Sequence, residues 1–129
     1  GICLGMQLLF ERSEEGNVAC LGVYRGIVKN FGKEKKIPQI GWNSVKINDT
    51  NIEAKKLLSR IPDKSYFYFV NSFYCLPEYK SIIAGESNYG EQFASIVVKE
   101  KVVGVQFHPE KSGKIGFTLL KDFIKNYVN

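Results

Sequence analysis

The N-terminal segment places a cysteine between two glycines, Gly1-Ile2-Cys3-Leu4-Gly5, ahead of an apolar stretch with helical spacing. Glycine adopts backbone angles that other residues resist, so this spacing permits a sharp turn from a strand into a helix. Such a turn exposes the Cys3 sulfur and directs a helix N-terminus at it, which lowers the pKa of the thiol. Taken alone, the pattern fits a reactive cysteine and a buried structural cysteine about equally well.

The chain has 129 residues, of which 44% are hydrophobic and 24% are charged, and this fits one globular domain. No apolar run approaches the roughly 18 residues of a membrane span, so we expect no membrane partner. The three cysteines are odd in number and lack the spacing of metal ligands. We therefore predict no disulfide framework, no metal site and a reducing, cytoplasmic environment.

The net charge of +5 raises the possibility of nucleic acid or another polyanion as a partner. The basic residues are dispersed, however, and the densest group lies around a predicted loop and consists of Lys29, Lys33, Lys35 and Lys36. Charge runs of this kind are usually solvated surface. We expect no nucleic-acid partner, and a polyanion binder is kept only as a competing hypothesis.

Hydrophobic periodicity and turn residues predict an alternation of helices and strands. The expected elements are a helix over 4–14 stopped by Gly16-Asn17, a strand over 22–31, a polar connection over 33–36, an extended segment over 37–47 broken by Pro38 and Gly41, a short helix over 53–60, strands over 66–70, 82–87, 94–99 and 102–107, and a helix over 112–127 capped by Ser112 or Gly113. The strand over 66–70 is predicted to be central, and a hairpin is predicted to join 94–99 to 102–107. The order predicts an α/β fold with a mixed sheet, a hairpin and a C-terminal helix.

A second motif, Gly104-Val105-Gln106-Phe107-His108-Pro109-Glu110, contains the single histidine of the chain. Pro109 keeps His108 extended, and residues two apart in an extended chain point the same way, so Glu110 can reach the imidazole and orient it. The other ring nitrogen is then free to act as a base toward Cys3. A lone histidine is more often structural, but together the two motifs specify a Cys-His-Glu hydrolytic triad of Cys3, His108 and Glu110. The backbone amide of Leu4, directly after the cysteine, is placed to donate to an oxyanion.

Residues 1–7 (GICLGMQ) and 107–110 (FHPE) resemble the class I, or triad, glutamine amidotransferases. Three further segments point to one branch of that family, the glutaminase subunits of imidazole glycerol phosphate synthase. They are Gly41-Trp42-Asn43, the strand 66–70 with Ser72, and Lys111-Ser112-Gly113. The resemblance extends over essentially all 129 residues.

The resemblance implies an enzyme that hydrolyses L-glutamine to glutamate and ammonia through a glutamyl thioester on Cys3, without a cofactor. It implies a heterodimer in which ammonia passes to a cyclase/synthase subunit for histidine biosynthesis. By the same resemblance, Gln7 and Ser72 meet the substrate, and Trp42, Asn43 and Lys111 face the partner subunit. Core packing is the alternative for Trp42, and a solvated surface position is the alternative for Lys111.

The sequence departs from this family in two ways. Gln39 and Asn71 stand where the family commonly has histidine, which leaves open a paralogous glutaminase that supplies ammonia for amination of surface-glycan sugars. The family also has βα units ahead of the cysteine turn, so we expect residues 1–129 to be the C-terminal part of an amidotransferase domain and to be inactive alone. A non-catalytic, partner-binding module is the other alternative for such a piece.

Overall fold

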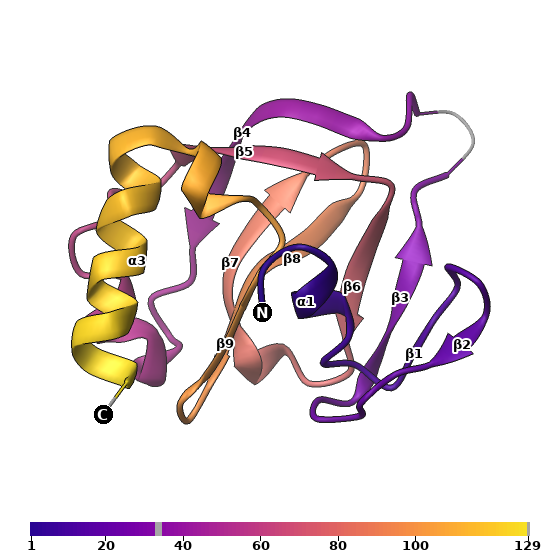
Figure 1. Ribbon diagram of the computed structural model, residues 1–129, viewed down its shortest axis with the longest axis horizontal. Coiled ribbons are helices and arrows are strands. Elements are labelled where there is room, and N and C mark those ends of the chain that lie inside the picture. The colour runs from indigo at the N-terminus through magenta and orange to yellow at the C-terminus, as the bar shows by residue number, and fades with distance from the viewer. Residues whose placement is uncertain (33–34, 129) are drawn as a thin grey trace.

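The computed structural model describes residues 1–32 and 35–128, which fold into a curved mixed sheet with a long C-terminal helix beside it (Figure 1). The strands are β1 (Arg12–Ser13), β2 (Val18–Ala19), β3 (Gly26–Asn30), β4 (Gln39–Ile47), β5 (Ser65–Asn71), β6 (Phe73–Pro77), β7 (Ile83–Asn88), β8 (Gln92–Lys99) and β9 (Val102–Val105). The α-helices are α1 (Leu4–Gln7), α2 (Lys55–Leu58) and α3 (Gly113–Tyr127), and the 3-10 turns are η1 (Ile52–Ala54), η2 (Lys80–Ile82) and η3 (Pro109–Lys111). The predicted α/β class is confirmed. None of the helices in the described ranges is long and apolar enough to cross a membrane.

The sheet runs in the order β2-β1-β3-β6-β8-β7-β4-β5, and β9 pairs with β8 beside this path. The named strands pair antiparallel, except that β1 lies parallel to β3. The hairpin between β8 and β9 forms as predicted and closes at the Lys99–Val102 pair. Ile2 adds a parallel bridge to Val105, so the first residues of the chain lie against β9. This bridge brings the N-terminal cysteine motif to the strand that leads into the histidine motif.

Aromatic packing between β5 and the segment after β9 forms the centre of the larger hydrophobic core. The Phe67 and Phe107 rings stack with centroids 4.0 Å apart, and Phe69 meets Phe107 edge-on. Helix α3 covers this core with Leu119 and Tyr127. A second cluster beneath α1 is centred on fully buried side chains and comprises Met6, Phe10, Tyr24, Val28, Cys75, Ile82, Ile83, Ala94 and Val97. The two motifs therefore lie between two packed cores.

The predicted helix over 4–14 is wrong beyond its first turn. Helix α1 ends at Gln7, and Arg12–Ser13 forms β1 instead. The reason is tertiary, because the Glu11 and Glu14 carboxylates accept hydrogen bonds from backbone amides of the β3 strand, at 2.8 and 2.9 Å. Gly16 and Asn17, taken as a helix stop, both have positive φ and lie in the turn between β1 and β2.

The predicted central strand over 66–70 is also misplaced, because β5 lies at one end of the strand order. Its residues alternate, with Phe67 and Phe69 fully buried and Tyr66 60% exposed. The segment 37–47 is not broken at Gly41, which has a φ of 129° and pairs in register with Phe69. The inward-facing side chains of Phe67 and Phe69 thus anchor this edge strand on the core.

Four smaller predictions also need correction. The strand predicted over 22–31 is limited to Gly26–Asn30, the one predicted over 102–107 ends at Val105, and β1, β2 and β6 were not predicted. The helical spacing of the apolar residues over 112–127 predicts that Ile124 is buried, but it is 63% exposed. Ser112 precedes α3 but makes no side-chain cap hydrogen bond. Of the polar connection predicted over 33–36, which includes Lys33, residues 33–34 lie outside the described residues.

A bidentate ion pair fastens α3 to the segment after α2. Arg60 donates from Nε to Asp122 Oδ2 at 3.1 Å and from Nη2 to Oδ1 at 2.6 Å. Asp122 is only 4% exposed, so its carboxylate depends on this partner. The Arg60 guanidinium lowers the pKa of Asp122. A lowered carboxyl pKa contributes stability at neutral pH that is lost as the pH falls below the ordinary value of about 4.

We predict that Arg60→Met lowers the Tm of the intact protein by about 5 °C at pH 7, because it leaves a buried carboxylate without its counter-charge. The same substitution at Arg25 is the matched control, since its pair with Glu78 is 3.8 Å long and exposed. Thermal unfolding followed by circular dichroism measures both. Equal Tm values for the two variants would contradict the role given to Asp122, as would a difference that persists undiminished at pH 3.

Candidate active site

Cys3 adopts a strained backbone conformation, with φ 53° and ψ −108°. Non-glycine residues avoid positive φ, and such strain persists only where the surroundings enforce it. Here the Cys3 amide donates to Val105 O at 2.8 Å, and the Val105 amide donates back to Gly1 O at 2.9 Å. The turn predicted from the glycine spacing is present, but the cysteine itself carries the positive φ.

Gly1 is required for a different reason, which is space. A Cβ built on Gly1 would lie 2.5 Å from the carbonyl carbon and oxygen of Gly5, whereas one built on Gly5 meets nothing within 4 Å in the described chain. The close approach of these two backbone segments lets the chain reverse from the β9 pairing into α1. Cys3 lies half-buried within this reversal.

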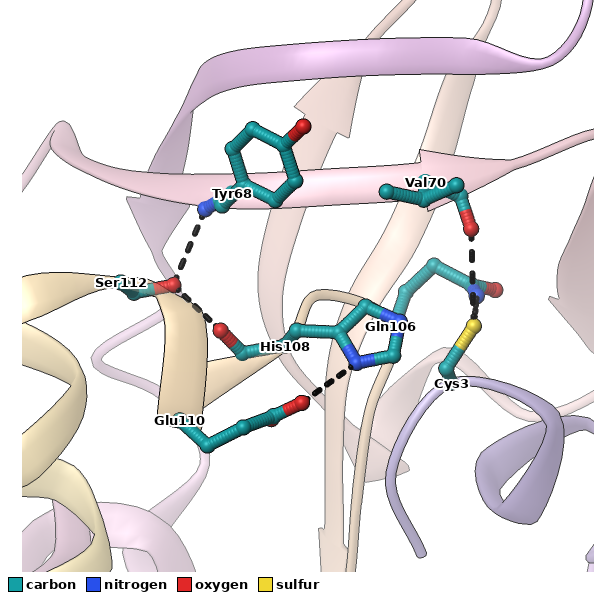
Figure 2. Close-up of polar contacts among 7 residues, drawn as sticks. All are labelled: Cys3, Tyr68, Val70, Gln106, His108, Glu110 and Ser112. Atoms are coloured by element: carbon teal, nitrogen blue, oxygen red, sulfur yellow. Dashed lines mark hydrogen bonds and ion pairs between the residues drawn. The ribbon is translucent and has the colours of Figure 1, made fainter.

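The Cys3 sulfur contacts both a hydrogen-bond acceptor and a donor. Its thiol is 3.6 Å from Val70 O, and Gln106 Nε2 lies 3.7 Å from the sulfur (Figure 2). Burial raises the pKa of the Cys3 thiol, and hydrogen bonds from the Leu4 amide and the Gln106 side chain act against that rise. The predicted lowering of this pKa is therefore wrong for the chain as described, because α1 has only four residues and desolvation outweighs its N-terminus.

His108 and Glu110 form the second half of the site. The distance from His108 Nδ1 to Glu110 Oε2 is 2.8 Å, and His108 is extended, with φ −101° and ψ 98°. Glu110 reaches the ring from the 3-10 turn η3, not from an extended strand as predicted. Burial alone would raise the pKa of Glu110, but its own backbone amide, His108 and Lys111 together lower it. The carboxylate is thus held ionised beside the imidazole.

Figure 2 shows the His108 ring between Glu110 on one side and the pair Cys3 and Gln106 on the other. No hydrogen bond joins His108 to Cys3 among the described contacts, in which the sulfur meets Val70 and Gln106 instead. The structure therefore brings the three predicted residues to one place while leaving the ring nitrogen opposite Glu110 without a bond to the sulfur.

The backbone of His108 is clamped to β5 by three hydrogen bonds. Its amide donates to Tyr68 O at 2.9 Å, while Ser112 Oγ donates to His108 O at 2.6 Å and accepts from the Tyr68 amide at 3.0 Å (Figure 2). Ser112 is 2% exposed, so water does not compete for these partners. Sequence reasoning assigned Ser112 to the helix cap and missed this role, because the partner strand lies more than forty residues earlier in the chain.

The two predicted substrate residues, Gln7 and Ser72, differ in burial and in their contacts. Gln7 is buried, and its Nε2 donates to Phe73 O at 3.1 Å and to Gln106 Oε1 at 3.2 Å. Ser72 is half-buried at the junction of β5 and β6, two residues after Val70. Gln7 is thus linked to the Cys3 sulfur through Gln106, whereas Ser72 is close in sequence to Val70, which contacts the sulfur. Contact of either residue with a substrate stays a prediction.

The three predicted partner-facing residues differ in their surroundings. Trp42 is 55% exposed and meets Tyr68 edge-on with ring centroids 5.8 Å apart, so core packing does not account for it. Asn43 Nδ2 donates to Gln39 Oε1 and to Asn88 O, both at 2.8 Å. Lys111 is exposed in η3 directly after Glu110. Trp42 and Lys111 are thus available to a partner, while both amide hydrogens of Asn43 are used within the chain.

Gln39 and Asn71, where the resemblance leads us to expect histidine, are both buried and bonded to each other. Gln39 Nε2 donates to Asn71 Oδ1 at 2.9 Å, and Asn71 Nδ2 donates to Phe73 O at 3.0 Å. The second bond ends on the carbonyl that also accepts from Gln7. A line of amide groups therefore connects Asn43 at β4 with Gln7 behind Cys3.

Within the described ranges, no group of three or more His, Cys, Asp or Glu side chains is arranged to hold a metal ion. All three cysteines are free thiols, and Cys75 is buried. The chemistry available at the site is therefore that of a thiol beside an oriented imidazole, with the Leu4 amide next to the sulfur. This combination is typical of acyl transfer through a cysteine nucleophile.

Comparison with known proteins agrees with this chemistry. The model of the class-I glutamine amidotransferase family matches residues 1–126, and the chain belongs to that family. Among its relatives, the imidazole glycerol phosphate synthase subunit HisH of Methanocaldococcus jannaschii is 45% identical over 126 residues, covering 97% of this chain and 62% of the relative. The subunit of the same name from Desulfitobacterium hafniense is 47% identical over 130 residues, covering 100% of this chain and 59% of the relative. The chain spans about three fifths of the length of these curated relatives.

The strained turn leads to a prediction about stability. Replacing Cys3 by glycine should give a more stable protein than replacing it by alanine, by about 1–2 kcal/mol, because only glycine adopts positive φ without strain. At Leu8, where φ is −64°, the same pair of variants should show the reverse order. Urea unfolding of the four variants measures this. An alanine variant at position 3 as stable as the glycine variant would show that the turn is unstrained.

The clamp leads to a second prediction. Ser112→Ala should destabilise the intact protein by about 1–3 kcal/mol, because it leaves the Tyr68 amide without a partner and leaves the His108 carbonyl with the Lys111 amide alone. Ser59→Ala is the control, since its hydroxyl is exposed and only 3.5 Å from the nearest acceptor. Urea unfolding compares the two. A loss at Ser112 no larger than that at Ser59 would mean that the clamp does not hold His108 in place.

Proposed function

We propose that this chain carries the glutaminase centre of an amidotransferase and that Cys3, His108 and Glu110 act there as nucleophile, general base and orienting carboxylate. The observation that carries the proposal is the 2.8 Å contact of Glu110 with His108 Nδ1, beside a cysteine held at positive φ. A carboxylate on Nδ1 fixes the imidazole tautomer, so that Nε2 is the nitrogen left to accept a proton. The orientation of this ring toward Cys3 in Figure 2 supports the same assignment.

In the proposed reaction, His108 takes the proton of the Cys3 thiol, and the thiolate attacks the side-chain carbonyl carbon of L-glutamine. The C–N bond then breaks, and the departing nitrogen takes the proton from the imidazolium and leaves as ammonia. Water, deprotonated by His108, attacks the resulting glutamyl thioester. Glutamate leaves, and the proton returns to the Cys3 sulfur. The atoms and charges balance without a cofactor.

The Leu4 amide is the proposed donor to the oxyanion of both tetrahedral intermediates. It follows the nucleophile directly, and its N–H acts to lower the pKa of the Cys3 thiol. Such a donor contributes most in a water-poor site, where its dipole needs no reorganisation. Ser72, half-buried between β5 and β6, is proposed to meet the amino-acid end of glutamine, and Gln7 is proposed to help hold the substrate.

The name of the HisH relatives, a subunit of imidazole glycerol phosphate synthase, supports a proposal for the fate of the ammonia. We propose that the chain belongs to a cytoplasmic glutaminase that acts with a cyclase/synthase subunit in making imidazole glycerol phosphate for histidine biosynthesis. Trp42 supports a partner surface at β4, because it is exposed and Ile40, two residues before it on the same strand face, is 65% exposed. Lys111 extends the proposed surface to the turn that carries Glu110.

The proposal predicts that Cys3→Ala abolishes release of glutamate from glutamine, by about 10⁴-fold or more, because no thioester can form. The assay is glutamate production by the intact protein with its cyclase/synthase partner present. Cys20→Ala is the matched control, since this half-buried free thiol contacts the Val18 carbonyl of its own segment, and it should keep normal turnover. Binding of the partner should survive in both variants. Glutaminase activity retained in Cys3→Ala would refute the assignment.

A further inference from the structure

We propose that Gln106 holds the Cys3 sulfur through an N–H donor and that Gln7 is the positioning residue that keeps this donor facing the sulfur. The inference rests on the proposed function only in assigning reactivity to Cys3. The contact joins the Cys3 sulfur to two buried side-chain amides. Gln7 lies on α1, and Gln106 lies on the segment after β9. Neither amide belongs to the proposed triad.

The orientation of the Gln106 amide is fixed by its hydrogen-bond partners. Gln106 is fully buried, so each end of its amide needs a protein partner. Its Oε1 accepts from Gln7 Nε2 at 3.2 Å, and this fixes the opposite end, the NH₂ group, toward the Cys3 sulfur at 3.7 Å (Figure 2). If the amide turned over, an oxygen would face the sulfur and an NH₂ would face another NH₂. The bond to Gln7 would be lost, and the sulfur would lose its N–H donor.

The Gln7 amide is itself prevented from turning over together with the Gln106 amide. Gln7 Nε2 also donates to Phe73 O, and a backbone carbonyl can only accept. The NH₂ group of Gln7 therefore has to lie between two acceptors, Phe73 O and Gln106 Oε1. The Phe73 carbonyl at the start of β6 thus fixes the orientation of both amides. As a result, the NH₂ group of Gln106 faces the sulfur.

The Gln106 N–H and the Val70 carbonyl affect the ionisation of the Cys3 thiol. Val70 O, 3.6 Å from the sulfur, accepts from the thiol and so favours the protonated form. The Gln106 N–H favours the ionised form, since a hydrogen bond to a charged acceptor is stronger than one to a neutral acceptor. The two contacts act in opposite directions on the same atom. Removing the Gln106 donor leaves burial and Val70 unopposed apart from the Leu4 amide, and the thiolate becomes scarcer.

The test is the pH dependence of Cys3 alkylation by iodoacetamide in the intact protein, followed at the Cys3 peptide by mass spectrometry so that Cys20 does not interfere. Gln106→Met should raise the midpoint of the curve by about one pH unit and slow alkylation at pH 8 about tenfold. Gln7→Met should shift the midpoint in the same direction, although this side chain does not touch the sulfur. Gln92→Met, the same substitution at an exposed glutamine, should leave the midpoint unchanged.

A second measurement needs no substitution at a buried position. In the unsubstituted protein, the side-chain NH₂ signals of Gln106 should shift with pH in NMR spectra, with the same midpoint as alkylation of Cys3. Unchanged midpoints in folded Gln106→Met or Gln7→Met, or Gln106 signals that do not follow the Cys3 titration, would overturn the proposal. Alkylation reports on the thiol alone, so these results are independent of whether Cys3→Ala loses glutaminase activity.

Discussion

The pairing of Ile2 and Cys3 with Val105 is the interaction on which the rest of the site depends. It enforces positive φ at Cys3, and it does so from the strand that continues into Gln106 and His108. One strand end therefore supplies the restraint on the cysteine, the donor to its sulfur and the imidazole. A shift of β9 against β8 would displace all three together. The two hydrophobic cores on either side of this strand oppose such a shift.

Placing β5 at the end of the sheet gives it a second task. One face of β5 supplies Phe67 and Phe69 to the core, while its backbone at Tyr68 binds the His108 main chain and its carbonyl at Val70 meets the Cys3 sulfur. A strand paired on both sides in the sheet would have had these backbone groups occupied by ladder hydrogen bonds. The edge position leaves them available, so the strand organises the site with its main chain.

Much of this architecture could be predicted because it depends on local sequence. The β8–β9 hairpin, helix α3 and the reach of Glu110 to His108 need only residues close in the chain. The failures share one physical origin, which is contact between distant segments. The local pattern places Glu11 and Glu14 in a helix, but their carboxylates bind the backbone amides of β3. The apolar run of β5 predicts a central strand, but the sheet order places β5 at one end. The Ser112 clamp and the Gln106 contact with Cys3 were missed for the same reason.

The line of amides from Asn43 through Gln39 and Asn71 to Phe73 O, and from Gln7 through Gln106 to Cys3, has a consequence for proton movement. Amide side chains donate and accept hydrogen bonds, but they do not release or take up protons near neutral pH. Histidines at positions 39 and 71 could have done so. These amide side chains therefore cannot relay a proton. A proton that leaves Cys3 has to depart on the side where His108 and solvent lie.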